Sequence, residues 1–193
     1  MKFRMLLMVL LFSFARAYNI DHQVWLLDKG RQFDSTGRLT QWWSDDAITA
    51  FKSKADCVRN LYDSYTLENG TIKVDGSLTL GENIADAGGV KAAFMAFKEH
   101  QMKKTASQLR HENQLVREYF ELDNADQLFF VSYGQVWCAN ERSSYQKIKV
   151  STDPHSPYQF RTNGPLSNYD EFSRVFKCPA NAPMNPSKKC VVW

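Results

Sequence analysis

Residues 79–89 read Thr-Leu-Gly-Glu-Asn-Ile-Ala-Asp-Ala-Gly-Gly, and the hydrophobic pattern of the chain changes within this stretch. Leu78 and Leu80 flank a threonine in strand-like alternation. The apolar residues that follow recur at helical spacing: Ile84, Val90, Ala93, Phe94 and Phe97. Glu82 and Asp86 lie four positions apart, so they share one face of the expected helix. Such a pair can serve a metal site, one carboxylate as ligand and the other orienting a neighbouring ligand. From the spacing alone, an acidic first turn, which the helix dipole favours, is the preferred interpretation, because this spacing of carboxylates is common on helices.

The composition is that of an ordinary globular domain. The chain has 193 residues, of which 44% are hydrophobic and 13% aromatic, enough to pack one core. Its net charge is only +3 and its basic residues are mixed with acidic ones, so a nucleic-acid partner has no support. We expect one domain without a linker.

The first residues have the organisation of a secretory leader. Two basic residues precede an apolar run at 5–14, which is too short to span a bilayer. Residues 15–17 are Ala-Arg-Ala, in which two alanines are spaced as small residues are at a signal-peptide cleavage site. This pattern predicts a signal peptide over residues 1–17 and a secreted, extracellular domain over residues 18–193, with no membrane span.

An extracellular location gives the four cysteines a structural meaning. Cys57, Cys138, Cys178 and Cys190 allow three pairings, and the residues alone do not choose among them. Asn69 begins an Asn-Gly-Thr glycosylation sequon, which predicts a surface loop of a glycoprotein.

The remaining pattern is mostly helical. Ser44 is expected to cap a helix whose inward face carries Ala47, Ile48, Phe51, Ala55, Val58 and Leu61. Further helices are expected over residues 82–104, 106–120 and 169–176, a helix or strand over 128–137, and loops over 67–76 and 153–164. The tryptophans Trp42, Trp43 and Trp137 are expected in the core, and His22, His100 and His111 outside any site.

Residues 78–86, closed by the two glycines at 88–89, resemble the third-ligand motif of the neprilysin and endothelin-converting enzyme family of zinc endopeptidases. Other motifs follow in the family's order: Asp-Lys-Gly-Arg-Gln-Phe-Asp at 28–34, Trp42-Trp43, Gln-Val-Trp-Cys at 135–138, His155-Ser156-Pro157, Phe160-Arg161, Asn163-Gly164, Met184-Asn185-Pro186 and Lys-Cys-Val-Val-Trp at 189–193. The resemblance covers nearly everything from Asp28 to Trp193. It implies a mainly α fold, the C-terminal part of a zincin-like (thermolysin-like) metallopeptidase catalytic domain, and it favours a helix over 128–137.

The resemblance also implies residue roles. Glu82 matches the family's third zinc ligand, and Asp86 matches the carboxylate that orients a zinc-bound histidine. His155 matches the histidine that hydrogen-bonds the oxyanion of the tetrahedral intermediate. Arg161 matches the arginine that grips the substrate main chain.

The family's cysteine pattern is only partly present. The resemblance favours a disulfide between Cys57 and Cys190, a long loop that would contribute about 4–5 kcal/mol in the chain-entropy model. In the family, the equivalents of Cys138 and Cys178 pair with cysteines near the start of the ectodomain. Here those two cysteines must pair with each other, stay free or bind another chain.

The H-E-x-x-H helix that supplies the first two zinc ligands and the catalytic glutamate should precede residues 28–34. Counting back, its histidines fall at Ile20 and Val24 and its glutamate at Asp21, and neither apolar side chain has a donor atom. His22 falls on a position of that helix that would not face the metal. The family's upstream substrate strand and N-terminal lobe would precede the mature chain. We therefore expect zinc not to be retained and peptide hydrolysis to be lost.

Two interpretations of function remain side by side. By descent the chain is a zinc metalloendopeptidase domain acting on peptides, catalytically inactive as written. The alternative is a secreted pseudoenzyme or binding module that engages peptides or a full-length relative, with Cys138 or Cys178 as a possible disulfide link to that partner.

Overall fold

The computed structural model describes residue 34 and residues 36–192. The predicted signal peptide, the positions counted for the zinc-binding helix and most of the 28–34 motif lie outside these described residues. Within them, no helix is both long and apolar enough to cross a membrane.

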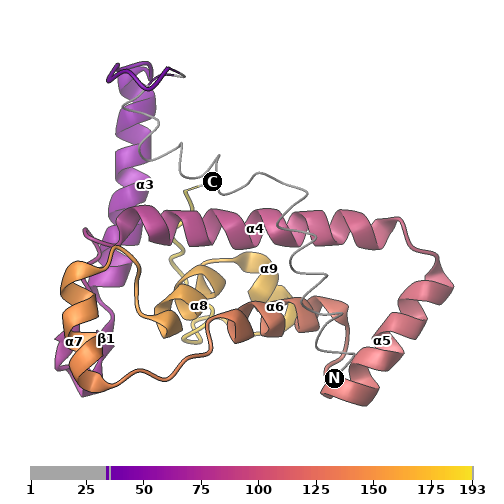
Figure 1. Cartoon of the computed structure of the whole chain (residues 1–193). Coiled ribbons are helices and arrows are strands. Elements are labelled where there is room, and N and C mark those ends of the chain that lie inside the picture. The colour runs from indigo at the N-terminus through magenta and orange to yellow at the C-terminus, as the bar shows by residue number, and fades with distance from the viewer. Residues whose placement is uncertain (1–33, 35, 193) are drawn as a thin grey trace.

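The architecture is mainly helical and is built on one long helix. This helix, α4 (Leu80–Met102), runs across the molecule in Figure 1, with α8 (Tyr158–Ser167), α6 (Ala125–Val136) and α9 (Asp170–Val175) beneath it. The remaining helices are α3 (Asp45–Asp63), which crosses near the start of α4, α5 (Ala106–Phe120) at its far end, and α7 (Ser143–Thr152). The α4–α8 contact is the most extensive between any two described elements. It brings together the two segments that carry the predicted site residues.

Two of the predicted helices begin at side-chain caps. The Ser44 hydroxyl accepts a hydrogen bond from the Ala47 backbone N–H at 3.3 Å, and α5 begins with a reciprocal capping box between Thr105 and Gln108. The α5 bounds match the prediction. In α3 the inward face is confirmed from Phe51 onward, but Ala47 is exposed because the first turn projects beyond α4 (Figure 1).

The predicted loop over 67–76 contains a small β-hairpin. Strands β1 (Thr66–Leu67) and β2 (Ile72–Lys73) pair antiparallel around a 3-10 turn at Glu68–Gly70. Asn69 and Gly70 have φ values of 55° and 94°, the left-handed region that asparagine and glycine tolerate best. The strands are too short for a two-residue period to be recognised in the sequence. Asn69 itself is exposed.

The start of α4 also differs from the prediction. Leu80 is helical rather than strand-like, because the turn before the helix is already set by Asp75, whose carboxylate accepts hydrogen bonds from the backbone N–H groups of Ser77 and Leu78 at 2.9 Å each. The stretch 128–137 is helical, as the resemblance implied.

The predicted loop over 153–164 is wrong in its second half. Helix α8 begins after Pro157 and continues through Pro165, with Phe160 and Leu166 buried. Pro165 lies inside the helix and cannot donate to the Arg161 carbonyl four residues earlier, which accepts a hydrogen bond from the Tyr133 hydroxyl instead. Helix α7 was not anticipated either, since its apolar residues do not form a clear stripe.

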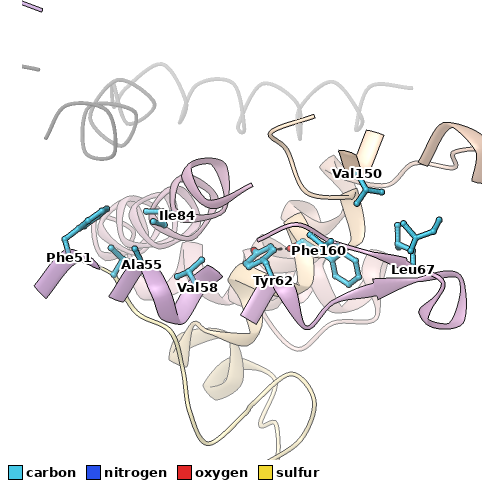
Figure 2. Packing of buried hydrophobic residues seen from close by; sticks show 11 residues of the cluster. Phe51, Ala55, Val58, Tyr62, Leu67, Ile84, Val150 and Phe160 are labelled. Carbon is cyan, nitrogen blue, oxygen red and sulfur yellow. Dashed lines mark hydrogen bonds between the residues drawn. The ribbon is translucent and has the colours of Figure 1, made fainter. Parts of the chain in front are cut away.

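The hydrophobic core has two parts that share α4. The first, shown in Figure 2, joins α3, the hairpin and Phe160 of α8 to Ile84 of α4. The second joins Val90 and Phe94 of α4 to residues of α6, α8 and α9, chiefly aromatic.

The prediction that the tryptophans lie in the core is wrong for Trp42, which is 57% exposed. Trp43 packs edge-on against Phe51 at 5.6 Å and covers the first core. Trp42 packs against the outer side of Trp43 at 5.9 Å, so it is one layer further out. Trp137 is half-buried beside the candidate site.

Candidate functional site

Two acidic residues of the first turns of α4 form one side of the candidate site. Glu82 and Asp86 share a face, as their spacing predicted, but their environments differ. The Glu82 side chain is 36% exposed and the Asp86 side chain only 10%. Glu82 therefore faces the open side of the site, whereas Asp86 lies between α4 and α8.

His155 faces Glu82 from the segment between α7 and α8. Its Nε2 lies 3.5 Å from a Glu82 carboxylate oxygen. On its other side, one oxygen of Asp153 accepts hydrogen bonds from the His155 backbone N–H at 2.9 Å and from ring Nδ1 at 2.8 Å. Burial alone would raise the pKa of Asp153, but these hydrogen bonds hold it below 3.8. Asp153 thus orients the ring so that Nε2 points toward Glu82.

Arg161 and Asp86 form a buried bidentate pair. The Arg161 Nε and terminal nitrogen each donate to a different Asp86 oxygen at 2.8 Å, and both side chains are at most 14% exposed. Burial raises the pKa of Asp86 above 3.8, an effect that the guanidinium only partly offsets. The Arg161 guanidinium also lies over the Trp137 ring, 3.8 Å from its centroid.

Tyr62, which is buried, and Tyr133, which is half-buried, hold the backbone of α8 next to Arg161. Tyr133 donates to the Arg161 carbonyl at 2.8 Å, and Tyr62 donates to the Phe160 carbonyl at 3.3 Å. Burial raises the pKa of both hydroxyls, so they act as donors at any ordinary pH. Sequence reasoning missed both residues. Tyr62 could have been found, since it continues the Phe51, Ala55 and Val58 stripe by one further helical step.

A stack of two aromatic rings with a cation at each end extends from Arg161 along the site wall. The Trp137 ring stacks on Tyr158 at 6.4 Å, and the Lys149 ammonium lies 3.7 Å from the Tyr158 centroid. Lys149 is itself neutralised by Glu141 at 3.0 Å, with both side chains buried. The stack therefore ties α6, α7 and α8 together behind Arg161.

The described residues do not fit a zinc ion. Across residues 34 and 36–192 no group of three or more His, Cys, Asp or Glu side chains is placed to hold a metal. Glu82 and His155 are two possible donors, whereas protein zinc sites use three or four protein ligands.

The cysteines follow the pairing that the resemblance implied. Cys57 of α3 and Cys190 of the C-terminal segment form a disulfide. Cys138 is exposed and Cys178 partly exposed, and neither is paired in the described structure. His100 and His111 are exposed and stand apart from the site.

Comparison with known proteins gives a consistent result. Residues 14–192 match the sequence profile of peptidase family M13. The chain is 42% identical over 166 residues to neprilysin-1 of Caenorhabditis elegans, covering 86% of this chain and 21% of that protein. It is 42% identical over 166 residues to endothelin-converting enzyme 1 of Rattus norvegicus, covering 86% of this chain and 20% of that protein. The chain thus spans about a fifth of the length of the curated relatives it matches.

Solved structures show the same fold. The zinc metalloprotease Zmp1 of Mycobacterium tuberculosis, in complex with an inhibitor, superposes with a TM-score of 0.75 at 28% identity, covering 88% of this chain and 25% of that one. The galactose-containing glycoprotein complex of Haemonchus superposes with a TM-score of 0.78 at 31% identity, covering 94% of this chain and 30% of that one.

Proposed function

This chain belongs to peptidase family M13, and we propose on that basis that it is the C-terminal part of a neprilysin-like peptidase domain that cannot hydrolyse peptides by itself. The observation that carries the proposal is the convergence of two distant segments. Glu82 and Asp86 of α4 meet His155 and Arg161, more than 70 positions later in the chain, at distances of 3.5 and 2.8 Å.

The proposed roles follow from this geometry and from the family. Glu82 would be the third zinc ligand, facing the open side, and His155 would supply a hydrogen bond to a substrate oxyanion. Arg161 would present its guanidinium to a peptide main chain, with Trp137 beneath it. Asp86 is proposed to orient a zinc-binding histidine, but here both of its oxygens are engaged by Arg161.

The loss of catalysis rests on the residues that stand where the zinc-binding helix should be. Ile20 and Val24 have no donor atom, and Asp21 is one methylene shorter than the glutamate of the motif. Of the three ligands of the family motif only Glu82 then remains in the sequence, and a catalytic zinc site requires three protein ligands plus a water molecule. Without a metal-bound water, peptide hydrolysis at neutral pH is lost.

Zinc content tests this proposal directly. The chain from Tyr18, dialysed against micromolar zinc, should contain close to none. The triple variant Ile20→His/Asp21→Glu/Val24→His restores H-E-x-x-H and should bind about one zinc per chain. Adding Glu82→Gln to the triple variant should weaken zinc binding, whereas adding Glu99→Gln, an exposed carboxylate on the same helix, should not.

Two outcomes would overturn the proposal. One zinc per chain in the natural sequence would mean that other residues have built a metal site. A triple variant that folds but stays free of zinc would mean that residues 20–24 or Glu82 do not have the assigned roles.

A second candidate function is a secreted pseudoenzyme that binds peptides or a longer relative. The unpaired, exposed Cys138 favours it, because an extracellular cysteine without an internal partner can form a disulfide with another chain. Non-reducing electrophoresis of the secreted protein should then show a larger species that Cys138→Ser or Cys178→Ser removes. A purely monomeric band would contradict a disulfide-linked partner.

The extracellular location is itself part of the proposal. Asn69 stands at the exposed tip of the hairpin, a surface position that a glycan can occupy. Expression in a secreting cell should yield a product whose mass falls on glycosidase treatment, and Asn69→Gln should abolish that change.

A further inference from the structure

Three fully buried polar side chains connect α4 to the segment that carries His155. Thr79, Asn83 and Ser156 are each 1% exposed. Ser156 donates to the Asn83 side-chain oxygen at 2.7 Å, and the Asn83 amide donates to the Thr79 hydroxyl at 2.9 Å. The Thr79 hydroxyl donates in turn to the Asp75 carbonyl at 2.8 Å.

This chain of hydrogen bonds has a single direction. Each hydroxyl has one proton, so the donation from Ser156 fixes which end of the Asn83 amide faces it, and the amide nitrogen must then face Thr79. Each hydrogen bond satisfies the polar group that follows it in the series, and water does not reach these buried side chains. Losing one link would strand a buried polar group, which makes this arrangement strongly preferred over others.

The buried link lies directly behind the candidate site. Asn83 follows Glu82 in the sequence and Ser156 follows His155, so the neighbours of the two facing side chains are bonded to each other. The outer pair, Glu82 and His155, is 36% and 41% exposed and 3.5 Å apart, whereas the inner pair is inaccessible and only 2.7 Å apart. The outer contact alone is too long and too exposed to hold the two segments in register.

We propose that Asn83 and Ser156 are positioning residues whose hydrogen bond sets the separation of Glu82 and His155. This inference deepens the proposed function, since it concerns the same site, but it requires neither zinc nor a bound peptide. Asp153 then sets the orientation of the His155 ring, and the Asn83–Ser156 bond sets where that ring stands relative to α4.

The test uses the ring nitrogens of His155 as the readout. The sequence has only four histidines, so the ¹⁵N resonances of the imidazoles can be assigned with a His155→Gln variant. Ser156→Ala should shift both His155 ring resonances while leaving those of His100 and His111 in place. Ser156→Thr, which keeps the hydroxyl, should restore the His155 resonances to their original positions.

The matched control is Ser167→Ala. Ser167 is also buried, at 5% exposure, and donates one hydrogen bond to the Gly164 carbonyl at 3.1 Å. Its loss should lower the melting temperature by a similar amount, about 5 °C, without moving the His155 resonances. Equal melting losses with unmoved His155 resonances in Ser156→Ala would overturn the inference and leave a purely structural bond.

The test does not depend on the folding of Ser156→Ala or on bound zinc. If Ser156→Ala does not fold, Ser156→Cys supplies a weaker donor at the same position and the same comparison. Because the resonances are measured without metal or peptide, a failed zinc reconstitution would count against the proposed function and leave this inference standing.

Discussion

Arg161 and Asp86 give the clearest prediction for single residues. Replacing Arg161 by methionine should lower the free energy of unfolding by about 3–5 kcal/mol, because the Asp86 carboxylate would remain buried without its bidentate partner. The double variant Asp86→Leu/Arg161→Met should be more stable than the single Arg161→Met, since no charge is then left unpaired. Urea denaturation of the natural chain, Asp86→Leu, Arg161→Met and the double variant measures both effects.

The exposed pair of Arg174 and Glu171 is the control for this prediction. Its side chains are 59% and 39% exposed although its shortest distance is 2.6 Å, so Arg174→Met should cost at most about 1 kcal/mol. If Arg161→Met proved as mild as Arg174→Met, Asp86 would be reached by water and could not be a fixed element of the site.

The Asp153 carboxylate should make the free energy of unfolding depend on pH. Its folded-state pKa is lowered below 3.8 by the hydrogen bonds from His155, so its ionised form contributes stability at pH values above 3.8. That contribution is lost as the pH falls through the lowered pKa of the folded state. The difference in unfolding free energy between the natural chain and Asp153→Asn should therefore shrink as the pH falls below about 4. A difference that grows on acidification would mean that the carboxylate is not paired as described.

The candidate site residues that could be proposed from sequence are those inside short recognisable motifs. Glu82, Asp86, His155 and Arg161 each stand in such a motif, and the structure brings them together. Their supporting residues could not be predicted in the same way, because the Tyr133 contact with the Arg161 carbonyl and the Asn83 contact with Ser156 join segments 28 and 73 positions apart. Which buried hydroxyl meets which acceptor is decided by the packing of helices, and no local pattern records it.

At the scale of elements, two helical glycines lie in different surroundings. Gly164 lies where α8 packs closely on α3, whereas Gly89 lies on an open part of the α4 surface. A Cβ added at Gly164 of α8 would collide with the Tyr62 hydroxyl and lie 2.6 Å from its ring, so Gly164→Ala should cost about 1–3 kcal/mol. A Cβ at Gly89 of α4 would meet nothing within 4 Å, so Gly89→Ala should stabilise the protein by about 0.5–1 kcal/mol through helix propensity.

Thermal unfolding of the two variants, with Gly134→Ala as a third, checks this prediction. A Cβ at Gly134 would make only an ordinary contact, 3.4 Å from a Thr162 methyl, so its effect should fall between the other two. Three equal melting temperatures would show that α8 can move away from α3, and that the α3–α8 contact does not hold Arg161 in place.

The elements that could be predicted are the ones whose local signals agree. The predictions of α4 and α5 followed from apolar residues at helical spacing, whereas the capping box that begins α5 was found only in the structure. The hairpin could not be predicted because each strand has two residues, and α8 was missed because its few apolar residues form no continuous helical stripe. In α8 tertiary burial of Phe160 and Leu166 outweighs the local cost of proline.

At the scale of the whole molecule, the C-terminal segment is attached to α3 and to the end of α8 by more than its disulfide. Val192 is buried in the first core, its carbonyl accepts a hydrogen bond from Lys54 at 3.0 Å, and the Cys190 backbone N–H donates to Asn168 at 2.6 Å. The disulfide between Cys57 and Cys190 closes a loop across 133 positions on top of these contacts. Its main effect should therefore fall on the unfolded chain, whose freedom it restricts.

Removing the disulfide should therefore destabilise the protein without detaching the C-terminal segment. Cys57→Ala/Cys190→Ala should lower the unfolding free energy by about 4–5 kcal/mol, or the melting temperature by about 10–20 °C, whereas Cys138→Ser should change neither. Amide hydrogen exchange of the folded variant decides where the effect lies. If it acts on the unfolded chain, the Cys190 amide stays protected because Asn168 still accepts its hydrogen bond. A Cys190 amide that exchanges freely while the helices stay protected would mean that the disulfide itself holds this segment on α3, and that reduction would expose the first core from its C-terminal side.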